Sequence, residues 1–285
     1  MGYLQTWYTT IEENDVLAAV SGEARRRGEK VMAKARTRTH AQVLEKMADL
    51  VDDQQRIVEH RPLIVRETHT EHGQPVIEAL DDFLQSYLGS LGWDRRRLLE
   101  QYRIVDVARK VVGVGSVGTR CRVILLLGVD DDDPLFLQVK EAQPSVLQPY
   151  LPSAQSFDNE GQRVVAGQRL IQGSPDIFLG WGELRGVQFY VRQLRDMKGG
   201  NEFREGRTDL DTLPDYCPLC GWALALAHAK SGDAAKIAGY AGKSDVLDDA
   251  IATFSLAYAD QTELDHERFV RAVRSGRIEV AEGSV

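Results

Sequence analysis

The chain reads Val112-Gly113-Val114-Gly115-Ser116-Val117-Gly118-Thr119 between two runs of β-branched and aliphatic residues, and this stretch decides the fold. It matches the pattern G-x-G-x-x-G, in which the missing side chains let backbone N–H groups close around phosphate oxygens. The pattern alone is weak, because a glycine-rich hairpin turn has the same composition. The residues around it therefore decide between a turn and a phosphate loop.

A dinucleotide-binding loop opens a helix, and a second strand that ends in an acidic residue follows that helix. Here residues 119–127 follow the last glycine at once, and this run is too rich in β-formers for such a helix. Only eleven residues separate Gly118 from Asp130. The sequence therefore excludes the dinucleotide-binding use of the pattern.

Strands are predicted on both sides of the loop, at 104–112 and 119–128, and a third at 135–141. In protein kinases a loop of this pattern bends two antiparallel strands over a nucleotide, and a lysine on the third strand pairs with the phosphates. Lys140 lies on the third strand, on the face shared with Gln138 and Phe136, because strand side chains alternate. A strand lysine is ordinarily an exposed edge residue, so the functional hypothesis rests on its conjunction with the glycine loop.

The acidic run Asp130-Asp131-Asp132-Asp133 joins the second and third predicted strands. Four carboxylates form a candidate metal site, but a polar turn closed by Pro134 is the commoner use of such a run. No metal site is predicted here.

The elements predicted after the third strand complete the order of strands and helix that a kinase small lobe has. A helix is predicted over 159–172, and strands over 176–184 and 187–194 are joined by the short turn Arg185-Gly186. The predicted fold class is α+β and protein-kinase-like, with a five-stranded antiparallel sheet, one helix, and a helical lobe formed by both chain ends.

Helices are predicted for the remainder of the chain. Apolar residues in 41–52 and 79–102 recur at helical spacing, so the N-terminal third is predicted to be all-α. Residues 218–230 are apolar almost all round, which predicts a buried helix, and an amphipathic helix is predicted after Ser244. The predicted domains are a helical segment at 1–103, a kinase-like small lobe at 104–197 and a helical large lobe at 198–285.

Four stretches of the chain carry more specific signatures. They are Val111-Val112-Gly113-Val114-Gly115-Ser116-Val117-Gly118-Thr119-Arg120, Leu135-Phe136-Leu137-Gln138-Val139-Lys140-Glu141-Ala142, Tyr190-Val191-Arg192-Gln193-Leu194-Arg195-Asp196-Met197-Lys198-Gly199 and His228-Ala229-Lys230-Ser231-Gly232-Asp233. These stretches resemble the bacterial family DUF2252, and the resemblance spans most of the chain. It implies a kinase-like fold and no established substrate.

The same resemblance implies a missing part. Full-length members carry an upstream G-D-A-H-x-x-N-F-G stretch and a later D-F-D, which are similar to the catalytic loop and the metal-binding aspartate of kinases. Neither stretch occurs in this sequence. The resemblance therefore predicts the C-terminal portion of a permuted kinase-like protein, without the upstream catalytic-loop segment.

The candidate phosphate-binding residues follow from the kinase pattern. Glu160, at the start of the predicted helix, is the only candidate glutamate to orient the lysine. Two positions depart from the pattern: Arg120 stands where a valine usually covers the adenine, and Gln138 stands where a small residue precedes the lysine. Both departures weaken the adenine pocket. The predicted site residues are Gly113, Gly115, Ser116, Gly118, Lys140 and Glu160.

His228 and Asp233 are the candidate catalytic residues. An aspartate after the apolar helix resembles a catalytic loop, because it can accept a hydroxyl proton. Against this role, no asparagine follows at the expected distance, and Ser231-Gly232 is typical of a helix end.

The charge and composition of the chain limit the classes of partner and the location that we expect. The net charge is -8, which opposes general affinity for nucleic acid or an anionic membrane. No apolar run approaches the roughly 20 residues that span a bilayer, and the start lacks the basic and apolar regions of a secretory signal. Three cysteines are too few for a disulfide framework. A cytoplasmic location is predicted.

The predicted function is that of a kinase-like phosphotransferase relative which binds nucleotide phosphates through the glycine loop and Lys140. ATP with Mg²⁺ is the implied cofactor, and the acceptor is an unidentified small molecule or protein. Catalysis by this chain is predicted to be incomplete. Two alternatives stay open: a non-catalytic binding or interaction module in which the glycine loop is only a turn, and a truncated gene product.

Overall fold

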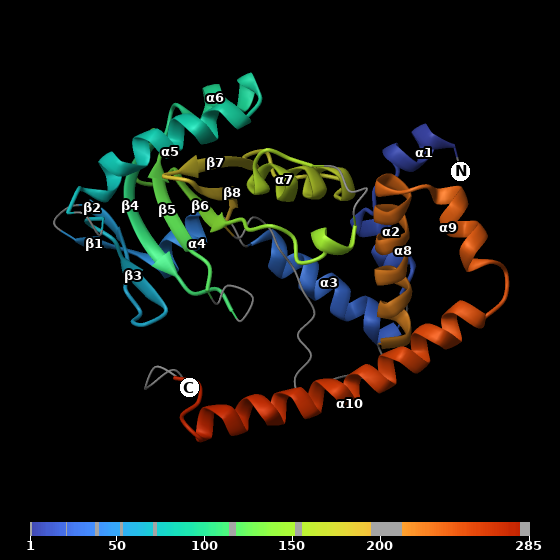
Figure 1. The fold of residues 1–285 in the computed structure, drawn as a ribbon. Coiled ribbons are helices and arrows are strands. Elements are labelled where there is room, and N and C mark those ends of the chain that lie inside the picture. Colours follow the sequence, from blue (N-terminus) through green and yellow to red (C-terminus); the bar gives the residue numbers. More distant parts are fainter. Residues whose placement is uncertain are drawn as a thin grey trace. The chain divides into compact units, whose positions relative to one another are not determined.

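The computed structural model describes residues 2–20, 22–37, 40–51, 54–70, 73–113, 118–151, 156–194 and 213–279. The chain separates into two compact units, Met1–Ser231 and Gly232–Val285 (Figure 1). The predicted division between residues 197 and 198 falls within 195–212, outside the described residues.

A six-stranded antiparallel sheet, in the order β3-β4-β5-β6-β8-β7, forms the centre of the first unit. Its strands are β3 (Ile64–Arg66), β4 (Arg103–Lys110), β5 (Cys121–Leu127), β6 (Pro134–Glu141), β7 (Gly180–Leu184) and β8 (Val187–Gln193). The last five match the strands that the sequence predicts. The prediction of a five-stranded sheet is wrong by one strand, because β3 is contributed by the N-terminal third and pairs with β4.

The helices of the first unit are α1 (Tyr3–Tyr8), α2 (Glu13–Ala18), α3 (Gly22–Arg36), α4 (His40–Met47), α5 (Val76–Ser90), α6 (Trp93–Leu99), the 3-10 helix η2 (Gln148–Tyr150), α7 (Glu160–Ile171) and α8 (Leu213–Ser231). The second unit contains α9 (Ala234–Ala241) and α10 (Val246–Arg274).

Each face of the sheet buries its own apolar cluster, because successive strand residues point to opposite sides. On one face, which we call the α5 face, Phe83 and Tyr87 of α5 pack with Ile124, Leu137 and Val191. Figure 1 shows α5 and α6 lying over this face. Two glycines of β7 allow the close approach: a Cβ on Gly180 would lie 2.7 Å from a ring carbon of Tyr87, and one on Gly182 2.9 Å from the ring of Phe83.

The opposite face, which we call the Lys140 face, is covered in part by α4 and by a two-stranded sheet of β1 (Ala48–Val51) and β2 (Gln54–Ile57). Met47 and Ile57 pack there with Val123, Leu125 and Phe136. The polar end of the same face, beyond these apolar residues, carries the candidate site.

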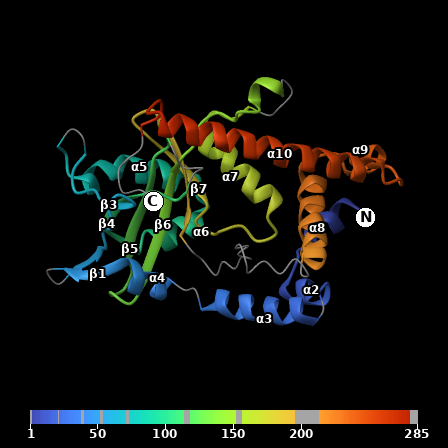
Figure 2. The same cartoon turned by 90° about the horizontal axis from the view of Figure 1, so that it is seen from below.

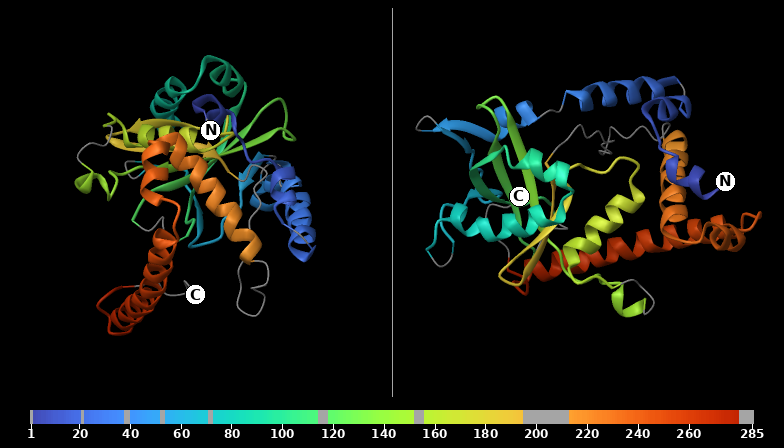
Figure 3. Two further views of the ribbon diagram at one scale, coloured as in Figure 1. Left: turned by 90° about the vertical axis from the view of Figure 1, so that its right-hand side faces the viewer. Right: turned by 90° about the horizontal axis from the view of Figure 1, so that it is seen from above.

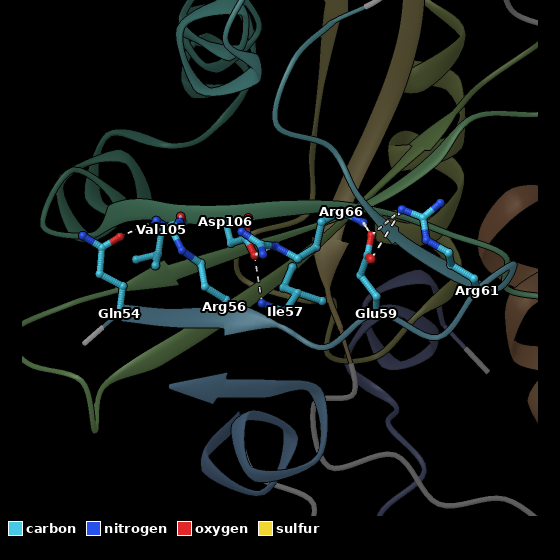
Figure 4. Close-up of polar contacts among 8 residues, drawn as sticks. All are labelled: Gln54, Arg56, Ile57, Glu59, Arg61, Arg66, Val105 and Asp106. Carbon is cyan, nitrogen blue, oxygen red and sulfur yellow. Dashed lines mark hydrogen bonds and ion pairs between the residues drawn. The ribbon is translucent and has the colours of Figure 1, made fainter. Parts of the chain in front are cut away.

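A buried carboxylate anchors the two-stranded sheet to the main one. Asp106 lies at an irregularity of β4 and accepts hydrogen bonds from the backbone N–H of Ile57 and from Nε of Arg66, each at 2.8 Å. Arg56 of β2 donates to the carbonyl of Val105 at 2.6 Å. Figure 4 shows this network between β2, β3 and β4.

The prediction of an all-α N-terminal third is wrong. The helix predicted over 41–52 ends at Met47, and the chain continues as β1. Leu50 and Val51, which match helical spacing in the sequence, are 60% and 45% exposed, so they do not extend the buried face of α4. The helix predicted over 79–102 is two helices, because Leu91 is extended and ends α5.

The helix predicted as buried, α8, has no buried residue among those described. It packs mainly against α7 and α1 (Figure 3), and Leu224 is largely exposed. Alanine makes much of its apolar surface, and alanine favours a helix whether or not the helix is buried. The prediction of a buried helix is therefore wrong.

The second unit consists of helices. The helix predicted after Ser244 begins at Val246, and α9 begins after Asp233. Of the residues described in this unit, only Ala272 is buried. None of the described helices has the length and apolar character needed to cross a membrane.

Candidate functional site

The glycine loop connects β4 to β5, and the structure describes its two ends. Gly113 and Gly118 have φ angles of 114° and 77°, which side-chain-bearing residues rarely adopt. A Cβ at either position would meet nothing within 4 Å, so backbone conformation rather than space requires glycine. Two predicted loop residues, Gly115 and Ser116, lie outside the described residues.

Lys140 lies at the end of the sheet where this loop is attached. It pairs with Cys121, the first residue of β5 after the loop. The register places Lys140 on the face of Gln138 and Phe136, as the alternation of side chains predicts. The Nζ atom lies 5.9 Å from the ring centroid of Tyr190 on β8, which is a cation–π distance.

Three cations act on one buried thiol at this end of the Lys140 face. Burial raises the pKa of Cys121, and the positive charges of Lys140, Lys110 and Arg192, with a hydrogen bond from Gln138, partly offset the rise. The cations come from three strands, β6, β4 and β8. We call Lys110, Lys140 and Arg192 the cation cluster. The raised pKa disfavours the thiolate, which is the nucleophilic form of cysteine.

Gln138 holds part of the cluster in place. Its side chain is 4% exposed; Nε2 donates to Sγ of Cys121 at 3.7 Å, and Oε1 accepts from Nε of Arg192 at 3.2 Å. Because both ends of the amide are engaged, the side chain has little freedom to rotate. It therefore fixes the position of Arg192.

Helix α7 also lies on the Lys140 face. The guanidinium of Arg169 is 5.9 Å from the ring centroid of Trp181, which pairs across β7 and β8 with Tyr190. Figure 2 shows α7 beside this end of the sheet. The helix begins after Asn159, whose side chain accepts the N–H of Gln162. Its place in the chain, between β6 and β7, matches the prediction of one helix between the third and fourth predicted strands.

Glu160 forms an ion pair with Arg163, one turn further along α7. Within the described ranges, no carboxylate forms an ion pair with Lys140. The orienting role of Glu160 therefore stays a prediction without a contact to support it.

Arg120, which stands where a valine usually covers the adenine in the kinase pattern, has a carboxylate partner of its own. Arg120 forms an ion pair with Glu141 at 3.1 Å, and Glu141 pairs with Phe189 of the α5 face. Partial burial opposes ionisation of Glu141, but hydrogen bonds from Gln143 and Arg120 outweigh it and lower the pKa. The β5 residue that faces the lysine is Cys121 instead.

The two candidate catalytic residues lie in different compact units. His228 is exposed on α8, and Asp233 is the N-cap of α9, where Oδ1 accepts the N–H groups of Ala235 and Lys236 at 3.0 Å. The carboxylate thus has a structural use that the sequence did not reveal.

The acidic run 130–133 forms the turn between β5 and β6, as predicted. Asp132 N–H donates to Oδ1 of Asp130 at 3.0 Å, and Asp133 accepts from Tyr102 and from Val129 N–H. In the part of the chain that the structure describes, no group of three or more His, Cys, Asp or Glu side chains is arranged to hold a metal ion.

A comparison with known protein families shows to which family this chain belongs. Residues 1–272 match the model of a bacterial family described as "Uncharacterized protein conserved in bacteria (DUF2252)". The chain belongs to the DUF2252 family. No curated protein and no solved structure matches it.

In this DUF2252 protein, the sequence offers Lys140 and the glycines as candidates for phosphate binding, but it does not group Arg192, Gln138 and Cys121 with Lys140. Arg192 lies inside a family signature, which was the available signal. The role of Arg192 depends on the pairing of β6 with β8, because this pairing places Arg192 beside Gln138, which lies 54 positions earlier in the chain.

Proposed function

We propose that this DUF2252 protein binds the phosphates of a nucleotide through the glycine loop and Lys140, on a scaffold related to kinase-like phosphotransferases. One observation carries the proposal. Lys140 lies at the end of the sheet where the glycine loop is attached, and Lys110 and Arg192 accompany it around Cys121.

The charge balance of the cluster supports an anionic ligand. Half-buried cations lose part of their hydration, which is unfavourable unless negative charge lies near them. Among the described residues, neither Lys140 nor Arg192 has a carboxylate partner. A polyphosphate would supply the missing negative charge through short, charge-assisted hydrogen bonds.

The glycine loop has a complementary role in the proposal. Backbone N–H groups of such a loop bind phosphate oxygens without the steric hindrance of side chains. Mg²⁺ enters as the counter-ion of the nucleotide phosphates, since the described residues contain no group of metal ligands of their own. The acceptor of a phosphoryl group, a small molecule or a protein, is left open, and the catalytic role predicted for His228 or Asp233 stays a prediction.

The proposal is tested by titrating ATP and GTP, with and without Mg²⁺, into the wild type and into Lys140→Ala by isothermal titration calorimetry. Loss of one charge-assisted contact is expected to weaken binding roughly 10- to 100-fold. Arg109→Ala is the matched control, because Arg109 is an exposed cation of β4 that pairs with Arg122 on the α5 face. It is expected to leave the affinity unchanged within about twofold.

Two results would overturn the proposal. The first is the absence of any nucleotide binding to the wild type, and the second is equal binding by Lys140→Ala. Either result would favour the alternative of a non-catalytic interaction module in which the glycine loop is only a turn.

A further inference from the structure

We infer that this site recognises triphosphates as such, irrespective of the nucleobase, because Gln138 closes the space for the base and positions Arg192 as a second phosphate-binding cation. The inference rests on the proposed phosphate site and specifies its ligand class. That class includes inorganic triphosphate as well as nucleoside triphosphates.

Gln138 closes the space for a base through the volume of its side chain and through its hydrogen bonds. Kinases carry alanine two residues before the strand lysine, in the pattern V-A-I-K. Here Gln138 stands at that position, 4% exposed, opposite Val123 and in contact with Cys121, which is 3% exposed. The larger side chain fills the surface on which a base would lie.

Displacing Gln138 would also be costly. Its Nε2 would lose Sγ of Cys121, and its Oε1 would leave Nε of Arg192 without an acceptor. An unsatisfied buried polar group costs about 1–3 kcal/mol, and more when it is charged. A base therefore gains little by entering this surface.

Arg192 has the geometry of a phosphate ligand. Gln138 binds its Nε atom, and within the described residues no acceptor binds the two terminal amino groups. A guanidinium held in this way offers a planar pair of donors that matches two phosphate oxygens. Arg192 pairs with Gln138 across β6 and β8, so Lys140, two residues further along β6, is its diagonal neighbour on the same face.

The contact between Arg192 and Gln138 has a purely structural alternative, in which it only joins β6 to β8. The two roles make different predictions. A structural contact affects unfolding and leaves ligand affinity alone, whereas a phosphate-binding arginine affects the affinity for every triphosphate to the same extent.

Calorimetric titrations with ATP, GTP, sodium triphosphate and adenosine, at one fixed ionic strength, test the inference. For the wild type we expect the three triphosphates to bind within about threefold of each other, and adenosine to give no detectable heat. Arg192→Gln is expected to weaken all three triphosphates roughly tenfold, and Arg192→Lys less, because lysine keeps the charge but loses the paired donors. Arg109→Gln is the matched control and should bind like the wild type.

A second variant guards against ambiguity. In Gln138→Ala the space for a base reopens and Arg192 loses its support, so the affinity for sodium triphosphate should fall more than the affinity for ATP. Urea unfolding of each variant verifies that it folds. If Gln138→Ala does not fold, the titrations of Arg192→Gln alone test the inference.

The outcomes separate the two proposals. If triphosphates bind through Lys140 but ATP binds more than tenfold tighter than sodium triphosphate, if adenosine binds, or if Arg192→Gln has no effect, only this inference fails. If no triphosphate binds the wild type, the proposed function fails and this inference fails with it.

Discussion

Asp106 illustrates how a single buried side chain determines where the N-terminal segment joins the sheet. The carboxylate is nearly inaccessible to solvent, and it holds an N–H group of β2 and the guanidinium of Arg66 on β3. A buried carboxylate is tolerated only when it is paired and hydrogen-bonded, and here both conditions are met. The same residue therefore ties three strands together.

Replacing Asp106 by alanine is expected to lower the free energy of unfolding by about 2–4 kcal/mol, because two hydrogen bonds are lost and Arg66 keeps a partly buried charge without its partner. Urea denaturation measures the change. Asp131→Ala is the control, since the ion pair of Asp131 with Arg103 is exposed on both sides and should contribute less than about 1 kcal/mol. Equal losses in the two variants would contradict the anchoring role.

Sequence reasoning was least effective at the level of single partners within the site. Lys140 is a candidate from the sequence alone because strand alternation and a nearby glycine pattern are local signals. The contact between Gln138 and Arg192 was missed because it spans two strands that are not consecutive in the chain. The pairing of Cys121 with Lys140 depends on where β5 begins, which no local pattern fixes to one residue.

At the scale of elements, the packing of α7 on the sheet depends on one glycine. A Cβ on Gly161 would lie 2.2 Å from the carbonyl oxygen of Phe189, whereas one on Gly167 of the same helix would meet nothing within 4 Å. The first glycine permits a close approach of helix and strand. The second has no such role and only weakens the helix.

Gly161→Ala is expected to destabilise the protein by about 1–3 kcal/mol, because the helix must move away from β8. Gly167→Ala should stabilise it by about 0.5–1 kcal/mol, since alanine is the better helix former. The two changes add the same methyl group to the same helix, so thermal or urea unfolding compares them directly. If both variants were destabilised, or both stabilised, the close approach at Gly161 would not control the position of α7.

The elements that the sequence predicts well share one property: their side chains are sorted by burial. Strands β4, β5 and β6 have long buried runs, β8 alternates between buried and partly exposed residues, and short turns join β5 to β6 and β7 to β8, so their pattern is strong. Strand β1 has one buried and three exposed residues, which is no strand pattern. Apolar residues of α4 and β1 together fit a helical period, and tertiary pairing with β2 overrides that local preference.

At the scale of the whole molecule, the charge of the chain and that of the site have opposite signs. The net charge of -8 repels extended polyanions at long range, whereas the cation cluster attracts a small anion at contact distance. The two effects are compatible because a triphosphate is small enough to lie wholly within the local field. Under the proposed function, this balance favours small phosphates over nucleic acid.

The two compact units differ in what they contribute to stability, and a shortened chain tests the difference. Both apolar clusters are made of residues between Val43 and Leu194, and no residue of the cation cluster lies beyond Arg192. All four tryptophans lie before Gly232, so their fluorescence reports on the first unit. A chain that ends at Ser231 is therefore expected to keep the urea midpoint of the tryptophan signal.

The same chain is expected to keep the response to triphosphates and to bind less of a hydrophobic dye, because exposed apolar side chains of α10, such as Ile251, Phe254 and Tyr258, are removed. A large fall in the midpoint, or loss of a cooperative transition, would show that residues 232–285 complete the core of the first unit. The sheet would then depend on a second unit that contributes to neither of its apolar clusters, and the assignment of stability to those clusters alone would be wrong.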